Sequence, residues 1–297
     1  MNNVIKLSPV VKSYLWGGNY FQKFNKGSQD VISELWELSI REDDSSYLFG
    51  TSTKIIDVLT KDDFGPNCDR FPYFPVLIKL IDARDDLSVQ VHPSDDYALN
   101  NEGSFGKSEM WYIIDADEGS GLYIGLNNNY TKEEIEEKLQ KGTIIDSLNF
   151  YKVKPGDSFI INPGTIHAIG KGVRIIEIQQ NSNLTYRLFD FFRKDKDGKF
   201  RELHIEKALK VIDFNKYSTE KADNSYLANN QYFKVKKIVI DGEITLSADK
   251  GSFISFTFIE GEGEVDNYQF NKFDTFFLSY KASCKIKGKA TLIVTTI

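Results

Sequence analysis

Alternating apolar and polar residues, the pattern of half-buried β-strands, recur along much of the chain. Runs rich in β-branched and aromatic residues stand at 73–82 (YFPVLIKLID), 87–92 (LSVQVH), 109–115 (EMWYIID) and 121–126 (GLYIGL). Turn-forming sequence such as DADEGSG separates the last two runs. Strand patterns resume over 151–180 and again from about Tyr226 to the C-terminus. The pattern predicts a mainly β protein.

Two segments have a helical pattern instead. Residues 131–142 (TKEEIEEKLQKG) begin with a capping box formed by Thr131 and Glu134, and a glycine follows the last periodic residue. A second helix is expected at 201–213 (RELHIEKALKVID). Many short strands with few helices predict a β-sandwich or β-barrel of the jelly-roll type.

Two distant segments of the chain are similar to one another. GDSFIINPGTIH (156–167) aligns without gaps with FDTFFLSYKASC (273–284). The alignment matches Asp157 with Asp274, Phe159 with Phe276, and His167 with Cys284. We therefore expect two related β-domains, of which the second lacks the histidine of the first. The polar segment 215–225 is the expected linker between a domain at 1–214 and a C-terminal β-domain at 226–297.

Charge and cysteine content narrow the possible partners and compartment. The formal net charge is −6, and no stretch concentrates Lys and Arg, so neither nucleic acid nor an anionic membrane surface is expected as a partner. Cys68 and Cys284 are too few and too far apart for a disulfide framework. The sequence has no signal-peptide pattern and no apolar run of the roughly 18 residues that a membrane span needs. A cytoplasmic protein is expected.

Polar residues interrupt three of the strand-like runs. Gln90 and His92 alternate with valines and therefore project from one face of a strand, Glu109 begins the next strand, and His167 lies on a third. If the four converge, two imidazoles, a carboxylate and an amide oxygen suit Zn²⁺ first and Fe²⁺ or Mn²⁺ next. Spacing alone leaves open that each histidine is an ordinary core residue. His204, on the expected second helix, is not expected to take part.

These polar residues lie in segments that resemble the signature segments of type I mannose-6-phosphate isomerases, zinc enzymes of the cupin superfamily. The segments are LSVQVHPSDDYA, GKSEMWYIID, PGTIHAIGKG and IIEIQQNSNLTYRLFD. LSPVVKSYLWGG and ISELWELS extend the resemblance, which covers at least residues 7 to 190. The short chain resembles the compact bacterial branch. The resemblance implies a cupin jelly roll, a sugar-phosphate isomerase activity and one Zn²⁺ per chain.

Matched position by position, the resemblance also implies roles for individual residues. The zinc ligands would be Gln90, His92, Glu109 and His167. Residues near the substrate would be Lys79, Ser88, Lys107, Glu177 and Arg187. A general cupin has His-x-His with a glutamate a few residues later. Here Gln90 replaces the first histidine and Glu109 stands well apart, as in this family.

The implied reaction moves a proton between C2 and C1 of an aldose through a cis-enediol. Glu177 is the first candidate for the base, because a carboxylate in an apolar strand can have a raised pKa. Lys107 and a metal-bound hydroxide are alternative bases, and Glu177 could instead be a structural partner of Arg174 or Lys171. Arg187 would bind the phosphate or stabilise the enediolate.

We therefore expect an enzyme that interconverts mannose 6-phosphate and fructose 6-phosphate. Alternatives that stay open are an isomerase of another sugar phosphate, an Fe²⁺-dependent cupin oxygenase, and a non-catalytic sugar-phosphate sensor. The expected partner is a small sugar phosphate. The sequence is compatible with either a monomer or a homodimer.

Overall fold

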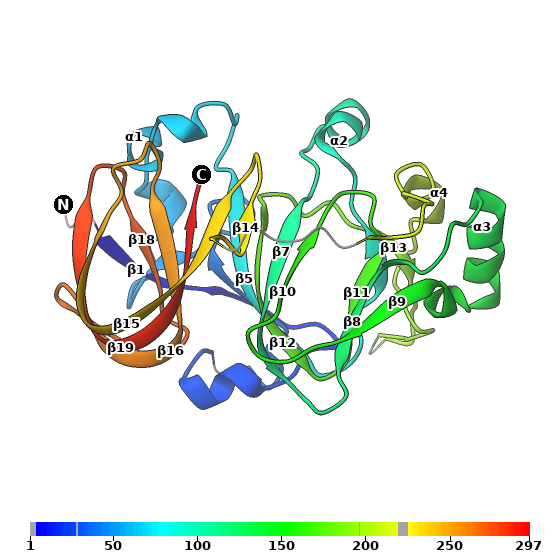
Figure 1. Cartoon of the computed structure of the whole chain (residues 1–297), viewed down its shortest axis with the longest axis horizontal. Coiled ribbons are helices and arrows are strands. Elements are labelled where there is room, and N and C mark those ends of the chain that lie inside the picture. Colours follow the sequence, from blue (N-terminus) through cyan, green and yellow to red (C-terminus); the bar gives the residue numbers. More distant parts are fainter. Residues whose placement is uncertain (1–3, 28, 196, 219–224) are drawn as a thin grey trace.

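In the residues that the computed structural model describes (4–27, 29–195, 197–218 and 225–297), the strands form three antiparallel sheets (Figure 1). The eight-stranded sheet has the order β14 (Ala228–Asn229), β15 (Lys234–Ser247), β19 (Ser283–Thr296), β16 (Ile254–Val265), β18 (Thr275–Leu278), β1 (Val4–Ser8) and β4 (Tyr47–Leu48), with β17 (Tyr268–Phe270) on β16. The six-stranded sheet has the order β10 (Ser158–Ile161), β7 (Glu109–Ala116), β12 (Val173–Gln180), β5 (Val76–Ala83), β3 (Glu34–Leu38) and β2 (Val10–Lys12). The five-stranded sheet has the order β13 (Tyr186–Phe189), β6 (Val89–Val91), β11 (His167–Ile169), β8 (Gly121–Leu126) and β9 (Leu148–Lys152). The prediction of a mainly β protein is confirmed.

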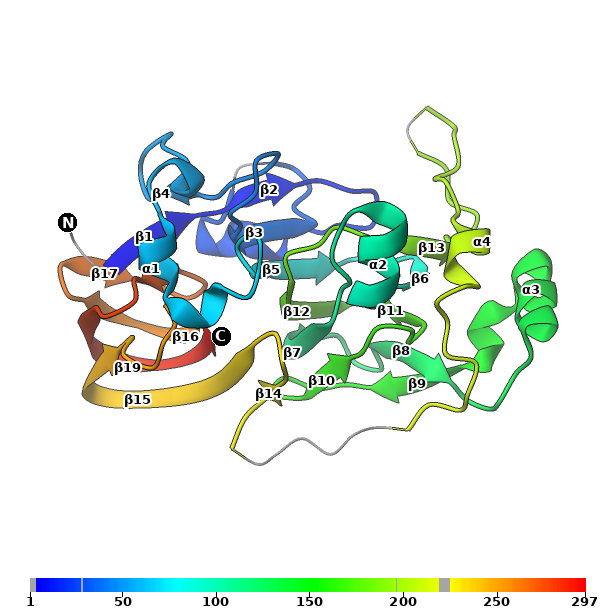
Figure 2. The same ribbon diagram turned by 90° about the horizontal axis from the view of Figure 1, so that it is seen from above.

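The helices are short and lie outside the sheets (Figure 2). They are α1 (Lys61–Phe64), α2 (Asp95–Glu102), α3 (Lys132–Lys141) and α4 (Ile205–Ala208), with 3₁₀ turns η1 (Tyr20–Phe24), η2 (Ile55–Asp57), η3 (Pro66–Cys68) and η4 (Ile144–Ser147). α3 has the expected capping box, and the glycine after it is left-handed. The expected helix at 201–213 is wrong in extent, because only 205–208 are α-helical. Among the described residues, no helix has the length and apolar character needed to cross a membrane.

The two related β-domains predicted from the sequence have a counterpart in the sheets. The order β10-β7-β12-β5 in one lobe recurs as β18-β16-β19-β15 in the other, with the strands in the same chain order. The matched aspartates close the same turn: Asp157 Oδ2 accepts the Lys154 N–H at 2.9 Å, and Asp274 Oδ2 accepts the Asn271 N–H at 2.8 Å. The sequence similarity therefore marks a repeated turn before an equivalent strand.

The N-terminal segment connects the two lobes. β1 pairs with β18 of the C-terminal sheet, whereas β2 pairs with β3 of the six-stranded sheet. The sheet pairing thus places β1 and β4 with the C-terminal strands, although both lie in the expected domain 1–214. The division at 215–225 stays a proposal, and residues 219–224 of that linker lie outside the described residues.

A buried apolar cluster joins the lobes. Aromatic rings from both sides meet there: Phe253 lies 5.0 Å from Phe74 and 5.1 Å from Phe277, measured between ring centroids. Rings at such separations add to the stabilisation that burial alone gives. The apolar contact indicates that the lobes pack as one body, with the first lobe's sheets held at fixed positions.

Lys26 neutralises a buried carboxylate beside this cluster. Its Nζ lies 3.5 Å from Glu37 Oε1 and 3.3 Å from Asp274 Oδ1, and Glu37 is 0% exposed. Burial raises the pKa of Glu37 despite this cation. Lys26→Met is expected to lower the free energy of unfolding by about 3–5 kcal/mol, because the buried carboxylate loses its partner. Lys23→Met, at an exposed lysine of the same segment, is the control for urea unfolding and should stay within about 0.5 kcal/mol of the parent. Equal stability of both variants would contradict the assignment.

Candidate active site

Two rows of cross-strand neighbours line the interior of the first lobe. Strand pairing in the six-stranded sheet aligns Trp36, Lys79, Glu177 and Trp111. Strand pairing in the five-stranded sheet aligns Arg187, Gln90, His167 and Ile124. Apolar residues of the two sheets pack together, so the inward faces of both rows are opposed. Period-2 alternation along each strand therefore brings these scattered residues into one chamber.

Three of the proposed metal ligands converge at the end of this chamber. One ligand atom from each of His92, Glu109 and His167 lies within 4.8 Å of the others, and all three residues are buried. His92 Nε2 lies 3.6 Å from Glu109 Oε2, and His167 Nε2 lies 3.2 Å from Glu109 Oε1. His92 follows β6, Glu109 begins β7 and His167 begins β11. A group of this kind can hold a metal ion.

Backbone carbonyls orient both imidazoles. His92 Nδ1 lies 3.0 Å from the Leu184 oxygen, and His167 Nδ1 lies 2.9 Å from the Thr165 oxygen. Because a carbonyl only accepts, each Nδ1 carries the proton, and each Nε2 lone pair points to Glu109. Burial lowers the pKa of His92 to about 3, aided by Lys107, and burial also lowers the pKa of His167. Burial thus favours the neutral form of both rings, the form in which an imidazole binds a metal.

The polar atoms left unpaired at this point fit a cation. Glu109 Oε1 and His167 Nε2 are buried and have no hydrogen-bond partner among the described residues. Burial raises the pKa of Glu109, but the adjacent Lys107 ammonium outweighs it and holds that pKa well below its usual range. An ionised carboxylate facing an imidazole lone pair is unfavourable unless a cation lies between them. The donor set fits a divalent metal ion.

Gln90 and Lys107 stand where this group of ligands meets a cavity. Gln90 lines the cavity and is the cross-strand neighbour of both His167 and Arg187. Lys107 is buried, donates a hydrogen bond to Glu109 Oε2 and has its Nζ 3.1 Å from His92 Nε2. The Glu109 carboxylate thus already has one positive charge beside it, that of Lys107.

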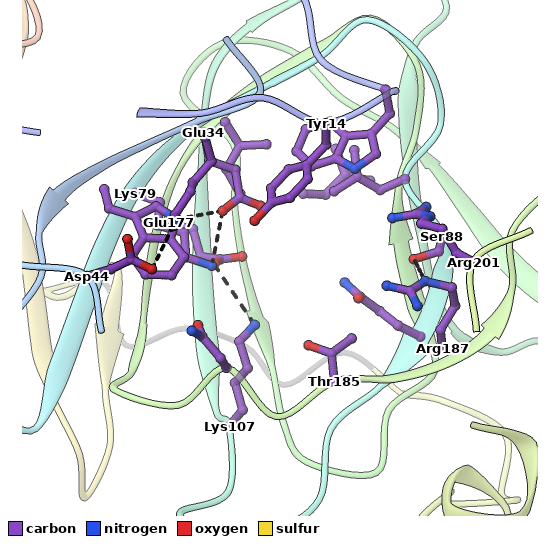
Figure 3. Close-up of a pocket in the computed structure, with 18 residues that line it drawn as sticks. Tyr14, Glu34, Asp44, Lys79, Ser88, Lys107, Glu177, Thr185, Arg187 and Arg201 are labelled. Carbon is purple, nitrogen blue, oxygen red and sulfur yellow. Dashed lines mark hydrogen bonds and ion pairs between the residues drawn. The ribbon is translucent and has the colours of Figure 1, made fainter. Parts of the chain in front are cut away.

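The cavity has a volume of about 390 Å³ and polarised walls (Figure 3). Figure 3 shows Glu34, Asp44, Lys79, Lys107 and Glu177 on one side of the space, with Ser88, Thr185, Arg187 and Arg201 on the other. The remaining lining residues are Lys12, Tyr14, Trp16, Trp36, Ile81, Leu87, Gln90, Ile169 and Asn183. Such a mixture of fixed charges and aromatic rings suits a small, polar, anionic ligand.

Glu177 has one hydrogen-bonded and one ion-paired oxygen in the wall of this cavity. Its Oε2 accepts a 3.0 Å hydrogen bond from Trp111 Nε1, whereas Oε1 has no hydrogen-bond partner among the described residues and lies 3.2 Å from Lys79 Nζ. Burial raises the pKa of Glu177, although Lys107 and Lys79 oppose the shift. Arg174 pairs with Asp82 at 3.1 Å instead, and Lys171 with an exposed aspartate, so neither alternative partner contacts Glu177.

Arg187 is fixed on the opposite wall. Its Nε donates to Ser88 Oγ at 3.3 Å, and its Nη1 donates to the Glu202 carbonyl oxygen at 2.8 Å. His204 contacts Arg187 rather than the ligand atoms: its Nδ1 accepts the Arg187 backbone N–H at 3.2 Å, and its side chain is 27% exposed. Burial lowers the pKa of Arg187, and Arg201 lowers it further.

Sequence reasoning missed several charged residues of the cavity. Glu34 contacts Lys79 at 3.7 Å and lies in the segment ISELWELS, which was identified without singling out this residue. Asp44 and Lys12, 2.6 Å apart, belong to no recognised motif. Arg201 lies at the start of the misjudged helix. These side chains reach the cavity through tertiary structure, so local patterns gave no signal for them.

The chain is similar in sequence and structure to proteins described as mannose-6-phosphate or phosphomannose isomerases. Residues 4–120 match the family described as phosphomannose isomerase type I, catalytic domain. The curated mannose-6-phosphate isomerase ManA of Bacillus subtilis is 36% identical over 308 residues, covering 96% of each chain. That of Streptococcus mutans is 34% identical and covers 84% of this chain and 83% of its own. The crystal structure of the mannose 6-phosphate isomerase from Bacillus subtilis superposes with a TM-score of 0.89 at 32% identity over 99% of both chains. A variant of the Salmonella typhimurium phosphomannose isomerase has a TM-score of 0.80 at 14% identity over 99% of both chains, which shows the shared fold.

Proposed function

The chain belongs to the type I phosphomannose isomerase family, and from this membership we propose that it interconverts mannose 6-phosphate and fructose 6-phosphate. One observation carries the proposal on this chain's own residues. One cavity has a carboxylate with a raised pKa and a cationic wall, and its lining residue Lys107 contacts the metal-ligand group at Glu109. These are the three parts that aldose–ketose isomerisation needs. The two cysteines are free and buried, which supports the cytoplasm as the compartment.

We propose one Zn²⁺ per chain as the ion, held by Gln90, His92, Glu109 and His167. Two neutral imidazoles and a carboxylate favour zinc among the common divalent ions. When bound, the ion supplies a Lewis acid that stabilises negative charge developing on the substrate oxygens. The backbone carbonyls that hold both Nδ1 atoms keep the imidazoles oriented for this role.

The charges on the two walls of the cavity determine how the bound substrate is oriented. The phosphate is drawn to Arg187 and Ser88, since the carboxylates of Glu34 and Glu177 repel it from the other end. The C1–C2 end then lies near Glu177, whose Oε1 takes the proton from one carbon and returns it to the other. Lys107, with Nζ 4.0 Å from that Oε1, and Lys79 supply positive charge next to the developing enediolate.

Glu177→Gln is expected to lower kcat by about 10²–10⁴-fold, because the amide cannot accept the proton. Zinc content and the circular dichroism spectrum should match those of the parent. Glu177 and Lys79 form an ion pair, so Glu177 could act only by neutralising Lys79. The double variant Glu177→Gln/Lys79→Met distinguishes that role from the role of catalytic base. Recovery of turnover in the double variant would show that Glu177 only neutralises Lys79. A persistent loss supports the base.

The substrate is tested by following fructose 6-phosphate formation from mannose 6-phosphate by the purified, zinc-loaded protein. A panel of other aldose phosphates runs in parallel, with oxygen uptake recorded. Turnover of mannose 6-phosphate above the others is expected. Preference for another aldose phosphate would support the isomerase reaction but contradict mannose 6-phosphate as the substrate. Oxygen uptake without isomerisation would overturn both.

A further inference from the structure

A second arginine faces the substrate cavity beside Arg187. Arg201 lines the same wall (Figure 3), and it lies in the long loop between β13 and α4 (Figure 2). An isolated bridge between Lys194 and Phe200 closes this loop, whose described residues 190–195 and 197–203 we call the arginine hairpin. The side chain is only 24% exposed although the hairpin projects from the lobe. A long surface segment therefore places one charged side chain in the cavity.

Asp190 fixes the orientation of Arg201. Its carboxylate, 6% exposed, accepts hydrogen bonds from both Nε and Nη2 of Arg201 and a further one from Nη2 of Arg193. Burial raises the pKa of Asp190, but Arg201 and Arg193 outweigh it and lower that pKa. A bidentate arginine–carboxylate pair has a defined plane and direction. The Arg201 guanidinium is thus held in place before any ligand binds.

Each arginine of the wall has one nitrogen left for a ligand. Arg201 Nη1 makes no hydrogen bond to the described residues, because Nε and Nη2 are taken by Asp190. Arg187 Nη2 likewise has no partner among the described residues, because Nε and Nη1 are taken by Ser88 and the Glu202 carbonyl oxygen. Two pre-oriented guanidiniums on one cavity wall match the several acceptor oxygens of a phosphate.

The charges of this wall do not balance. Arg187 and Arg201 line the cavity, and Arg193, which does not line it, shares with Arg201 the buried carboxylate of Asp190, while Glu202 is 83% exposed. Like charges brought together in this way are unfavourable, and Arg201 contributes to the lowered pKa of Arg187. A negatively charged phosphate monoester would offset this excess of positive charge. No neutral sugar would do so.

Backbone strain marks the entry to the arginine hairpin. Phe191 and Phe192, directly after Asp190, have φ of 54° and 53°, in the left-handed region that non-glycine residues rarely adopt. Strain of this kind persists where surrounding contacts determine the conformation, and it concentrates at functional sites. Phe191 packs 5.1 Å from Phe189 and 5.3 Å from the Arg193 guanidinium. The entry is therefore fixed on both sides of Asp190.

We propose that Arg201 is the second half of a two-arginine phosphate clamp and that Asp190 is its positioning residue. The clamp would select phosphorylated aldoses over free ones by binding the phosphate monoester dianion. The identity of the sugar rests on the proposed function, whereas the phosphate contact does not.

The test compares Arg201→Met and Asp190→Asn with the control Lys199→Met, which removes one positive charge from an exposed position of the same hairpin. Arg201→Met should raise KM for mannose 6-phosphate roughly 10- to 100-fold with kcat within about 3-fold, the loss expected for a hydrogen-bonded charge pair. Asp190→Asn should raise KM less, and Lys199→Met should leave it unchanged. Arg201→Lys should recover part of the loss by restoring charge without the fork.

Calorimetric titration with inorganic phosphate provides a readout that does not depend on turnover. Phosphate affinity should fall in Arg201→Met by the same factor as KM rises, while the circular dichroism spectrum stays that of the parent. Unchanged phosphate affinity and KM in folded Arg201→Met or Arg201→Gln protein would overturn the clamp. Lowered phosphate affinity in a protein that isomerises no aldose phosphate would support the clamp and overturn the proposed function.

Discussion

Glu109→Gln protein is expected to lose both its metal ion and its turnover. Glu109 is the only carboxylate among the three buried residues whose ligand atoms converge, and its charge is the one a divalent ion would find there. The amide is nearly isosteric but neutral, so it weakens the site without opening a cavity. Removing a Lewis acid worth several kcal/mol corresponds to a fall in kcat of about 10³-fold or more. Elemental analysis and the coupled isomerase assay on the same sample measure both effects.

Glu34→Gln is the matched control for metal content. Glu34 is also a carboxylate of the cavity, but its partners are Lys79 and Trp36 rather than the imidazoles. Its substitution should leave one zinc per chain. Full zinc occupancy in Glu109→Gln, or equal loss in both variants, would contradict the assignment of Glu109 as a ligand.

Arg187→Ala should separate catalysis from metal binding. Arg187 lies next to Gln90 across the β13–β6 pairing, but it belongs to no group of ligand atoms. Its loss is expected to lower kcat by about 10²-fold, because the phosphate contact at Arg187 orients the C1–C2 end at Glu177 and a misplaced substrate transfers its proton more slowly. Zinc content should stay at that of the parent. Normal turnover by a metal-replete Arg187→Ala protein would contradict the role.

The contrast between Arg187 and Arg201 sharpens this expectation. Arg187 lies beside the metal-ligand row, whereas Arg201 lies on the hairpin side of the cavity and is held by Asp190. Loss of Arg187 should therefore act mainly on kcat, and loss of Arg201 mainly on KM. A fall in kcat as large in Arg201→Met as in Arg187→Ala would show that Arg201 also orients the C1–C2 end of the substrate.

Strands could be predicted where alternation and turn residues coincide. The run GLYIGL at 121–126 is β8, and the capping box at Thr131 begins α3, because both signals are local. The helix expected at 201–213 is limited to α4 (Ile205–Ala208), and Arg201, before its start, is instead paired with Asp190 at the cavity. The pairing of β1 with β18 joins opposite ends of the chain, and no local pattern encodes it.

The candidate site was predictable in part for a similar reason. Each proposed ligand lies in a recognisable segment, but convergence of the residues depends on strand pairing that only the fold provides. Arg201 and Asp44 come from segments without a motif, so sequence reasoning passed over them. The C-terminal third offered no family segment either. The alignment to the Bacillus subtilis relative nevertheless covers 96% of the chain, so the similarity is not confined to the recognised segments.

Chelation followed by zinc restoration tests the central claim most directly. The purified protein is stripped of metal, its fold is checked by circular dichroism, and conversion of mannose 6-phosphate to fructose 6-phosphate is measured before and after addition of one equivalent of Zn²⁺. Loss of turnover in the folded, stripped protein and its return with zinc is the expected result. Undiminished turnover by folded protein that retains no metal would contradict a metal-dependent isomerase at His92, Glu109 and His167.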